Sequence, residues 1–295
     1  MKYFVQMPIK RECNLQCFYC FHSDFHQNKG IYENGNRFPM GFSIEQWQKW
    51  RDKFLINADE ILINFHGGET FHNDNVELIL NHIQTSIDSI QTYEFLSNGL
   101  ENAENYTKII VPFKDKIRRI GFTYHRSIID HNEELKNKFI QNVLFVKNLG
   151  VSVYIKELLL VKYRESIMKN SVWWWENHNV EVKIQDFKGI KGLDNSEHEK
   201  YTVLDELIVN DEYKHDKSKF CTCMDGYKTI NIFGFDELGG NVTPCFLDQV
   251  IVGNINDMTF NPNYRVDRLD GSSKRNVIGV PKKYIGTHPL LHCGK

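Results

Sequence analysis

Hydrophobic positions along the first two thirds of the chain alternate between short strand-like runs and longer stripes at helical spacing. Short runs rich in Ile, Val, Phe and Tyr predict six strands, and the stripes between them predict helices. The expected strands are 3–7, 60–65, 93–96, 117–124, 151–161 and 180–187, and the expected helices are 44–55, 75–89, 104–110, 133–149 and 165–177. Such alternation indicates a parallel sheet with helical crossovers. We therefore expect an α/β protein built as a partial (β/α)6 TIM-like barrel.

Local signals mark the ends of two of these helices. Ser43 and Gln46 have the spacing of a capping box, in which each side chain bonds the other's backbone N–H. Gly150 follows the fourth helix and can adopt the left-handed conformation that ends helices. Both signals support the helical reading of the apolar stripes next to them.

Length and charge narrow the class of protein. A chain of 295 residues fits one barrel-type domain with a small appendage. Its 36 Lys and Arg residues against 38 Asp and Glu residues give a net charge of -2. This balance does not favour a nucleic-acid or membrane-surface partner. No apolar run approaches a membrane span, and the start lacks a signal-peptide core, so we expect a cytoplasmic protein with reduced thiols.

Three cysteines follow the first predicted strand directly. Cys13, Cys17 and Cys20 form a Cys-x3-Cys-x2-Cys motif. Three thiolates on one loop suit a cubane iron–sulfur cluster with one iron left open. A zinc site is the alternative and would need a fourth ligand such as His22 or His26. A disulfide framework is disfavoured by the odd total of seven cysteines.

Glycine-rich or polar turns follow the next three strands. Carboxyl ends of parallel strands meet at one edge of a barrel, so these turns and the cysteine loop predict a cofactor pocket there. The strand-end residues are Gly67, Gly68, Glu69, Ser97, Asn98 and His125. His125 has a structural hydrogen bond as its alternative role. Lys156, within the fifth strand, reaches the cofactor only if it points inward, which alternation leaves open.

These motifs together resemble the radical S-adenosylmethionine (SAM) superfamily over roughly residues 3–190. The shared features are the cysteine motif, an aromatic residue, Tyr19, before its last cysteine, and a Gly-Gly-Glu motif after the second strand. The resemblance implies that the three cysteines ligate a [4Fe-4S] cluster whose open iron chelates S-adenosylmethionine. It places Tyr19 against the adenine and Ser97 and Asn98 near the ribose or methionyl part. Gly67 and Gly68 would approach the methionyl group, leaving Glu69 or backbone carbonyls near its ammonium.

The same resemblance implies a reaction. A reduced cluster passes one electron to the sulfonium, and the resulting 5'-deoxyadenosyl radical removes a hydrogen atom from a substrate C–H bond. A flavodoxin or ferredoxin would supply the electron. We expect a peptide or protein substrate, and oxidation or rearrangement of a small molecule, such as a sugar or cofactor precursor, is the alternative. A non-catalytic metal-binding scaffold is the hypothesis of another class.

The carboxyl-terminal part contains the other four cysteines. We expect a linker at 191–220 between the barrel, 1–190, and an extension, 221–295, that contains a β-hairpin. The late cysteines are Cys221, Cys223, Cys245 and Cys293. Their number suits a second four-ligand site, with structural zinc or spare thiols as alternatives.

This extension also has counterparts in the superfamily. Residues 240–245 resemble the Gly-x4-Cys element of SPASM and twitch extensions, and 252–255 resembles its continuation. The resemblance implies an auxiliary iron–sulfur cluster. Cys221 and Cys223 are closer than the usual spacing and a full SPASM array is missing, which favours one auxiliary cluster over two. Either of these two cysteines is also a candidate hydrogen-atom donor.

Overall fold

A computed structural model describes residues 1–9, 13–15, 17, 42–85, 90–159, 163–186, 227–232, 240–243 and 251–261. Within them lies one sheet of ten strands, in the order β10-β9-β8-β7-β1-β2-β3-β4-β5-β6. The strands are β1 (Lys2–Pro8), β2 (Glu60–His66), β3 (Gln91–Ser97), β4 (Ile117–Tyr124), β5 (Val153–Leu159), β6 (Glu181–Asp186), β7 (Tyr227–Ile232), β8 (Asn241–Thr243), β9 (Gly253–Asn254) and β10 (Thr259–Phe260). The helices are α2 (Ile44–Phe54), α3 (Asn73–Thr85), α4 (Ala103–Phe113), α5 (Arg126–Ile129), α6 (Glu133–Asn148) and α7 (Arg164–His178), with a 3-10 turn at Lys114–Lys116.

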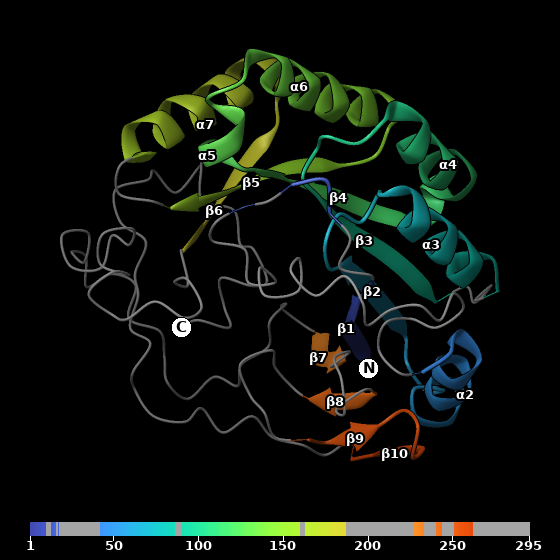
Figure 1. Ribbon diagram of the computed structural model, residues 1–295. Coiled ribbons are helices and arrows are strands. Elements are labelled where there is room, and N and C mark those ends of the chain that lie inside the picture. Colours follow the sequence, from blue (N-terminus) through green and yellow to red (C-terminus); the bar gives the residue numbers. More distant parts are fainter. Residues whose placement is uncertain are drawn as a thin grey trace, which may run out of the picture.

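Strands β1 to β6 form the predicted partial barrel. Each pairs in parallel with the next strand along the chain, from β1 with β2 to β5 with β6. The helices lie along the outer, convex side of the curved sheet (Figure 1). The predicted α/β class and parallel strand order are therefore confirmed.

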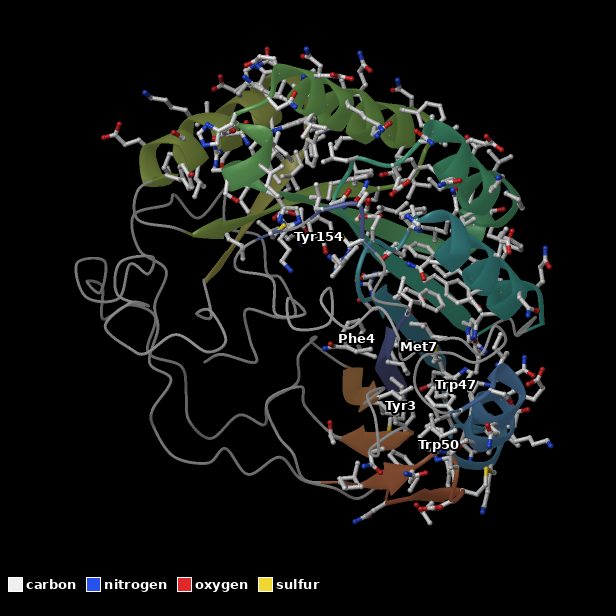
Figure 2. All side chains as sticks on the ribbon, viewed as in Figure 1. Tyr3, Phe4, Met7, Trp47, Trp50 and Tyr154 are labelled. Atoms are coloured by element: carbon white, nitrogen blue, oxygen red, sulfur yellow. The ribbon has the colours of Figure 1, made fainter. Side chains whose placement is uncertain are left out.

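The hydrophobic core lies between the sheet and these helices. Tyr3, Val5 and Met7 of β1 are buried in the main cluster of apolar side chains. Successive side chains of a strand point to opposite faces, and Phe4 accordingly packs with Leu62 in a separate cluster. Figure 2 shows Phe4 on the side of β1 opposite Trp47 and Trp50 of α2. Alternation puts the buried polar residues Gln6 and Asn64 on this same concave face, beside Phe4 and Leu62.

Helix α2 joins the start of the barrel to the last described strands. It begins with the predicted capping box, in which Ser43 Oγ accepts from Gln46 N and Gln46 Oε1 accepts from Ser43 N. Its buried Trp50 donates from Nε1 to the Thr259 carbonyl at 2.9 Å, and its ring packs edge-on against Phe260 with centroids 4.9 Å apart. These contacts join α2 to β10, the strand at the edge of the sheet.

The predicted hairpin in the extension is present, and it continues the barrel sheet. β7 and β8 pair antiparallel, with Asn231 opposite Thr243. β7 also pairs in parallel with β1 on the side away from β2, so the hairpin adds to the same sheet. The expected linker, 191–220, lies outside the described residues. In the helices that the structure describes, none is long and apolar enough to cross a membrane.

Candidate metal and cofactor site

The Gly-Gly-Glu turn after β2 places a carboxylate among three hydrogen-bond donors. Glu69 is fully buried, and its Oε1 accepts from Phe71 N at 2.9 Å and from Ser97 Oγ at 2.8 Å. Its Oε2 accepts from Asn98 N at 2.6 Å. Burial raises the pKa of Glu69 to about 7, although the hydrogen bonds from Asn98, Phe71 and Ser97 favour its charged form. Glu69 thus ties the end of β2 to the end of β3.

The Ser-Asn-Gly turn after β3 is fixed from both sides. Ser97 Oγ lies 3.0 Å from the Tyr106 hydroxyl of α4, and Asn142 of α6 donates to the Gly99 carbonyl at 2.8 Å. Gly99 has φ +76°, and a Cβ there would lie 2.5 Å from Cδ2 of Phe139. Both the left-handed backbone and the close ring require glycine at this position. Asn98 is therefore held in one place.

Asn98 connects this turn to the cysteine loop. Its Oδ1 accepts from Leu100 N at 2.9 Å, which directs its Nδ2 toward Cys13 Sγ at 3.7 Å. The same Nδ2 donates to Oδ1 of Asn14. Cys13 is half-buried and also accepts from Leu15 N at 3.4 Å. The first cysteine of the motif thus lies beside the predicted strand-end residue Asn98.

The second cysteine lies beside the end of β4. Cys17 is buried, and its Sγ is 3.4 Å from Nδ1 of His125. Burial, and then the positive charge of Lys156, lowers the pKa of His125 to about 4, so the imidazole is neutral at neutral pH. His125 also begins α5, because its carbonyl accepts from the N–H groups of Ile128 and Ile129 at 2.9 Å.

Lys156 lies on the concave face of the sheet. Its neighbour Glu157 is fully buried on the other face and accepts from Nε of Arg126 at 2.6 Å. Alternation then puts Lys156 on the face of β5 shared with Tyr154, which Figure 2 shows on the inner side of the sheet. The inward orientation that Lys156 needed for a cofactor contact is present. Arg126 and Glu157, which sequence reasoning missed, hold α5 and so the His125 turn against β5.

The remaining predicted site residues are two glycines, one tyrosine and five cysteines. Gly67 and Gly68 are half-buried in the turn after β2. Tyr19, Cys20 and the four late cysteines lie outside the described residues. Among the residues that the structure describes, no three His, Cys, Asp or Glu side chains gather as a metal site.

The chemistry of the described part fits the implied cluster. Asn98 directs an N–H group at Cys13 Sγ, and Nδ1 of His125 lies beside Cys17 Sγ, where it can donate when that sulfur is a thiolate. A thiolate ligand carries negative charge on its sulfur, and a hydrogen bond from an N–H group stabilises that charge. Sequence reasoning missed Asn14, which bonds Asn98 through one side-chain atom and the Leu100 carbonyl through the other. Its position between two cysteines was the only signal that could have indicated it.

Comparisons with known proteins find likeness in solved structures. No protein-family model matches the chain, and no curated protein does. The structure of anSMEcpe with bound AdoMet and a Cp18Cys peptide matches with a TM-score of 0.54 and 15% identity, over 88% of this chain and 78% of that one. SuiB of Streptococcus suis with bound S-adenosylmethionine matches with a TM-score of 0.54 and 13% identity, over 88% of this chain and 66% of SuiB.

A further structure is that of SuiB bound to the precursor peptide SuiA. It matches with a TM-score of 0.52 and 12% identity, over 88% of this chain and 65% of SuiB. At such identities the likeness concerns the fold. It confirms the fold that the resemblance to the radical SAM superfamily implied.

Proposed function

We propose that this protein is a radical SAM enzyme that abstracts a hydrogen atom from a peptide or protein. The observation that carries the proposal is the meeting of Cys13 and Cys17 with Asn98 and His125 at one edge of a barrel whose fold is shared with S-adenosylmethionine-bound structures. A three-cysteine loop and polar strand ends at that edge are what a chelated cluster requires.

Each residue of the site has a role in this proposal. Cys13, Cys17 and Cys20 would hold a [4Fe-4S] cluster, which, when bound and reduced, supplies the electron that cleaves S-adenosylmethionine. Gly67 and Gly68 would let the backbone approach the methionyl group. Because the Glu69 carboxylate is bonded to Ser97 and Asn98, backbone carbonyls of this turn would accept from the methionyl ammonium. Lys156, on the concave face, would bind the methionyl carboxylate. Tyr19 would lie against the adenine.

Support for a peptide substrate comes from the similar structures. anSMEcpe was solved with a Cp18Cys peptide, and SuiB with its precursor peptide SuiA. In the same proposal, the extension at 221–295 binds one auxiliary iron–sulfur cluster through Cys221, Cys223, Cys245 and Cys293. A flavodoxin or ferredoxin in the cytoplasm would deliver the electron to the barrel cluster.

Iron counting tests the ligand roles. The full chain is reconstituted anaerobically with iron and sulfide, beside Cys17→Ala, Cys245→Ala and the control Ser152→Ala, which changes an exposed residue before β5. Each cysteine variant is expected to lose about four iron atoms per chain, the content of one cubane cluster. The control keeps them all. An unchanged iron content in Cys17→Ala would contradict the assignment of a cluster to the barrel. A colourless wild-type protein loaded with zinc would contradict the assignment of both the barrel cluster and the auxiliary cluster.

Deuterium transfer tests the substrate class. The reconstituted enzyme is incubated with reductant, S-adenosylmethionine and either perdeuterated tryptic peptides or a perdeuterated small-metabolite fraction. The proposal expects deuterium in 5'-deoxyadenosine from the peptide fraction, because the radical takes its hydrogen from the substrate. Deuterium only from the metabolite fraction contradicts a peptide substrate.

A further inference from the structure

Each described cysteine of the motif has a side-chain nitrogen beside its sulfur, and the two nitrogens come from turns after different strands. Asn98, after β3, directs Nδ2 at Cys13 Sγ over 3.7 Å. His125, after β4, places Nδ1 3.4 Å from Cys17 Sγ. These distances fall within the longer range that hydrogen bonds to sulfur have. Each of the two sulfurs therefore has its own neighbouring nitrogen.

Both donors are held in place from behind. The Asn98 backbone N–H is bound by Glu69, and its Oδ1 is bound by Leu100 N, so the amide group has one orientation. His125 is fixed by the first turn of α5, which Arg126 joins to Glu157 at 2.6 Å. Preorganised donors of this kind lose little entropy when they bond to sulfur. Their positions are set by contacts with the strand-end turns and α5, and for Asn98 also by its bond to Asn14.

We propose that Asn98 and His125 set the reduction potential of the cluster by hydrogen bonding to the sulfurs of Cys13 and Cys17. This inference rests on the proposed function, since it requires that these cysteines hold a cluster. A cysteine that ligates iron is a thiolate and has no proton, so Nδ1 of His125 must be the protonated nitrogen there. An N–H group directed at a ligating sulfur stabilises the more negative, reduced state of a cluster. Burial of Cys17 strengthens this effect, because water screens it less.

The consequence is a difference between donor and non-donor side chains at position 125. His125→Phe keeps a flat ring and removes the N–H group. His125→Asn places an amide N–H close to where Nδ1 lies. A role that only fills space would favour the phenyl ring, whereas a hydrogen-bonding role favours the amide.

The test is a redox titration of the reconstituted full chain, monitored by electron paramagnetic resonance and visible absorption. His125→Phe is expected to shift the equilibrium about tenfold toward the oxidised cluster, equivalent to a potential about 59 mV lower. His125→Asn is expected to stay close to wild type. A shift of similar size in both variants would mean that the N–H group does not set the potential, and that result overturns the proposal. So does an unchanged potential in His125→Phe.

The same titration is carried out on Asn98→Leu, which removes the amide N–H group. Asn98→Gln, which keeps an amide N–H group, is its control. The Leu variant is expected to lower the potential in the same direction while the iron content stays at the wild-type value. A potential that does not change in an iron-complete Asn98→Leu protein overturns the role of Asn98. If the wild type itself binds no iron, the proposed function fails instead, so the two failures are distinguishable.

Discussion

The Asn98 backbone N–H donates to Oε2 of Glu69 at 2.6 Å, and this bond joins the two glycine-containing turns at the barrel edge. Asn98 in turn directs its side chain to Cys13. A carboxylate 29 residues away in sequence thus determines where a donor to the first cysteine lies. Glu69 is in this account a positioning residue, whose influence on the cysteine loop passes through Asn98.

The raised pKa of Glu69 has a consequence for stability. Burial raises that pKa to about 7, above the value in the unfolded chain, so the folded protein holds the proton more tightly. The resulting stability is fully present below about pH 4.5 and is lost as pH rises through about 7. We expect the free energy of unfolding of the apo protein to fall over this range by up to ~3 kcal/mol. Glu69→Gln should lack this slope. Urea denaturation at pH 5 and pH 8 measures it, and equal slopes in the two proteins would contradict the assignment.

The turn glycine Gly99 is expected to tolerate no side chain. Gly99→Ala combines a left-handed backbone, which costs about 1–2 kcal/mol for other residues, with a contact of 2.5 Å to the Phe139 ring. Gly150→Ala is the matched control, because Gly150 also has positive φ but meets only the flexible end of Lys114. Gly99→Ala should therefore lower the free energy of unfolding more than Gly150→Ala does. Thermal unfolding compares them, and an equal loss in the two variants would refute the ring contact.

The contact between α2 and β10 is expected to stabilise the last described strands. Trp50→Phe removes the hydrogen bond to the Thr259 carbonyl and part of the packing on Phe260. A lost hydrogen bond of this kind costs about 1 kcal/mol. Hydrogen exchange should then speed up at the amide of Asn261, which donates to the Val252 carbonyl. Trp175→Phe, at an exposed position of α7, serves as control, and the prediction fails if both variants exchange like wild type.

The ion pair of Arg126 and Glu157 is expected to behave as a buried unit. Arg126→Met leaves the Glu157 carboxylate buried without its cation, which costs about 3–5 kcal/mol. The double variant Arg126→Met/Glu157→Met removes both charges and should be more stable than Arg126→Met alone. Urea denaturation of Arg126→Met, Glu157→Met and the double variant gives the coupling. Additive losses would mean that the two side chains act independently.

Periodicity in the sequence predicts most of the barrel. The strand expected at 117–124 has the bounds of β4 (Ile117–Tyr124), and the capping box at Ser43 begins α2 as predicted. These features depend on neighbouring residues, which a sequence pattern records. The fifth strand begins at Val153 rather than at the predicted residue 151, and α5, of four residues, is too short to show an apolar stripe.

The contacts within the site could not be predicted from the same patterns. Glycine and polar residues at strand ends indicated which turns meet, because all parallel strands end at one edge. Ser97, which donates to Glu69, comes from a different turn. The face of the sheet on which Lys156 lies follows from the pairing of its neighbour Glu157 with Arg126 on the other face. Such choices are set by tertiary hydrogen bonds, which leave no period in the sequence. The parallel pairing of β7 with β1 likewise joins segments more than 200 residues apart.

Reductive cleavage of S-adenosylmethionine is the reaction that defines the proposed activity. The full chain is reconstituted anaerobically, reduced with dithionite and mixed with S-adenosylmethionine, and 5'-deoxyadenosine and methionine are measured by mass spectrometry. A radical SAM enzyme should form both products in equal amounts, and Cys17→Ala should form neither. A wild-type protein that holds an intact cubane cluster and yet never forms 5'-deoxyadenosine is not a radical SAM enzyme.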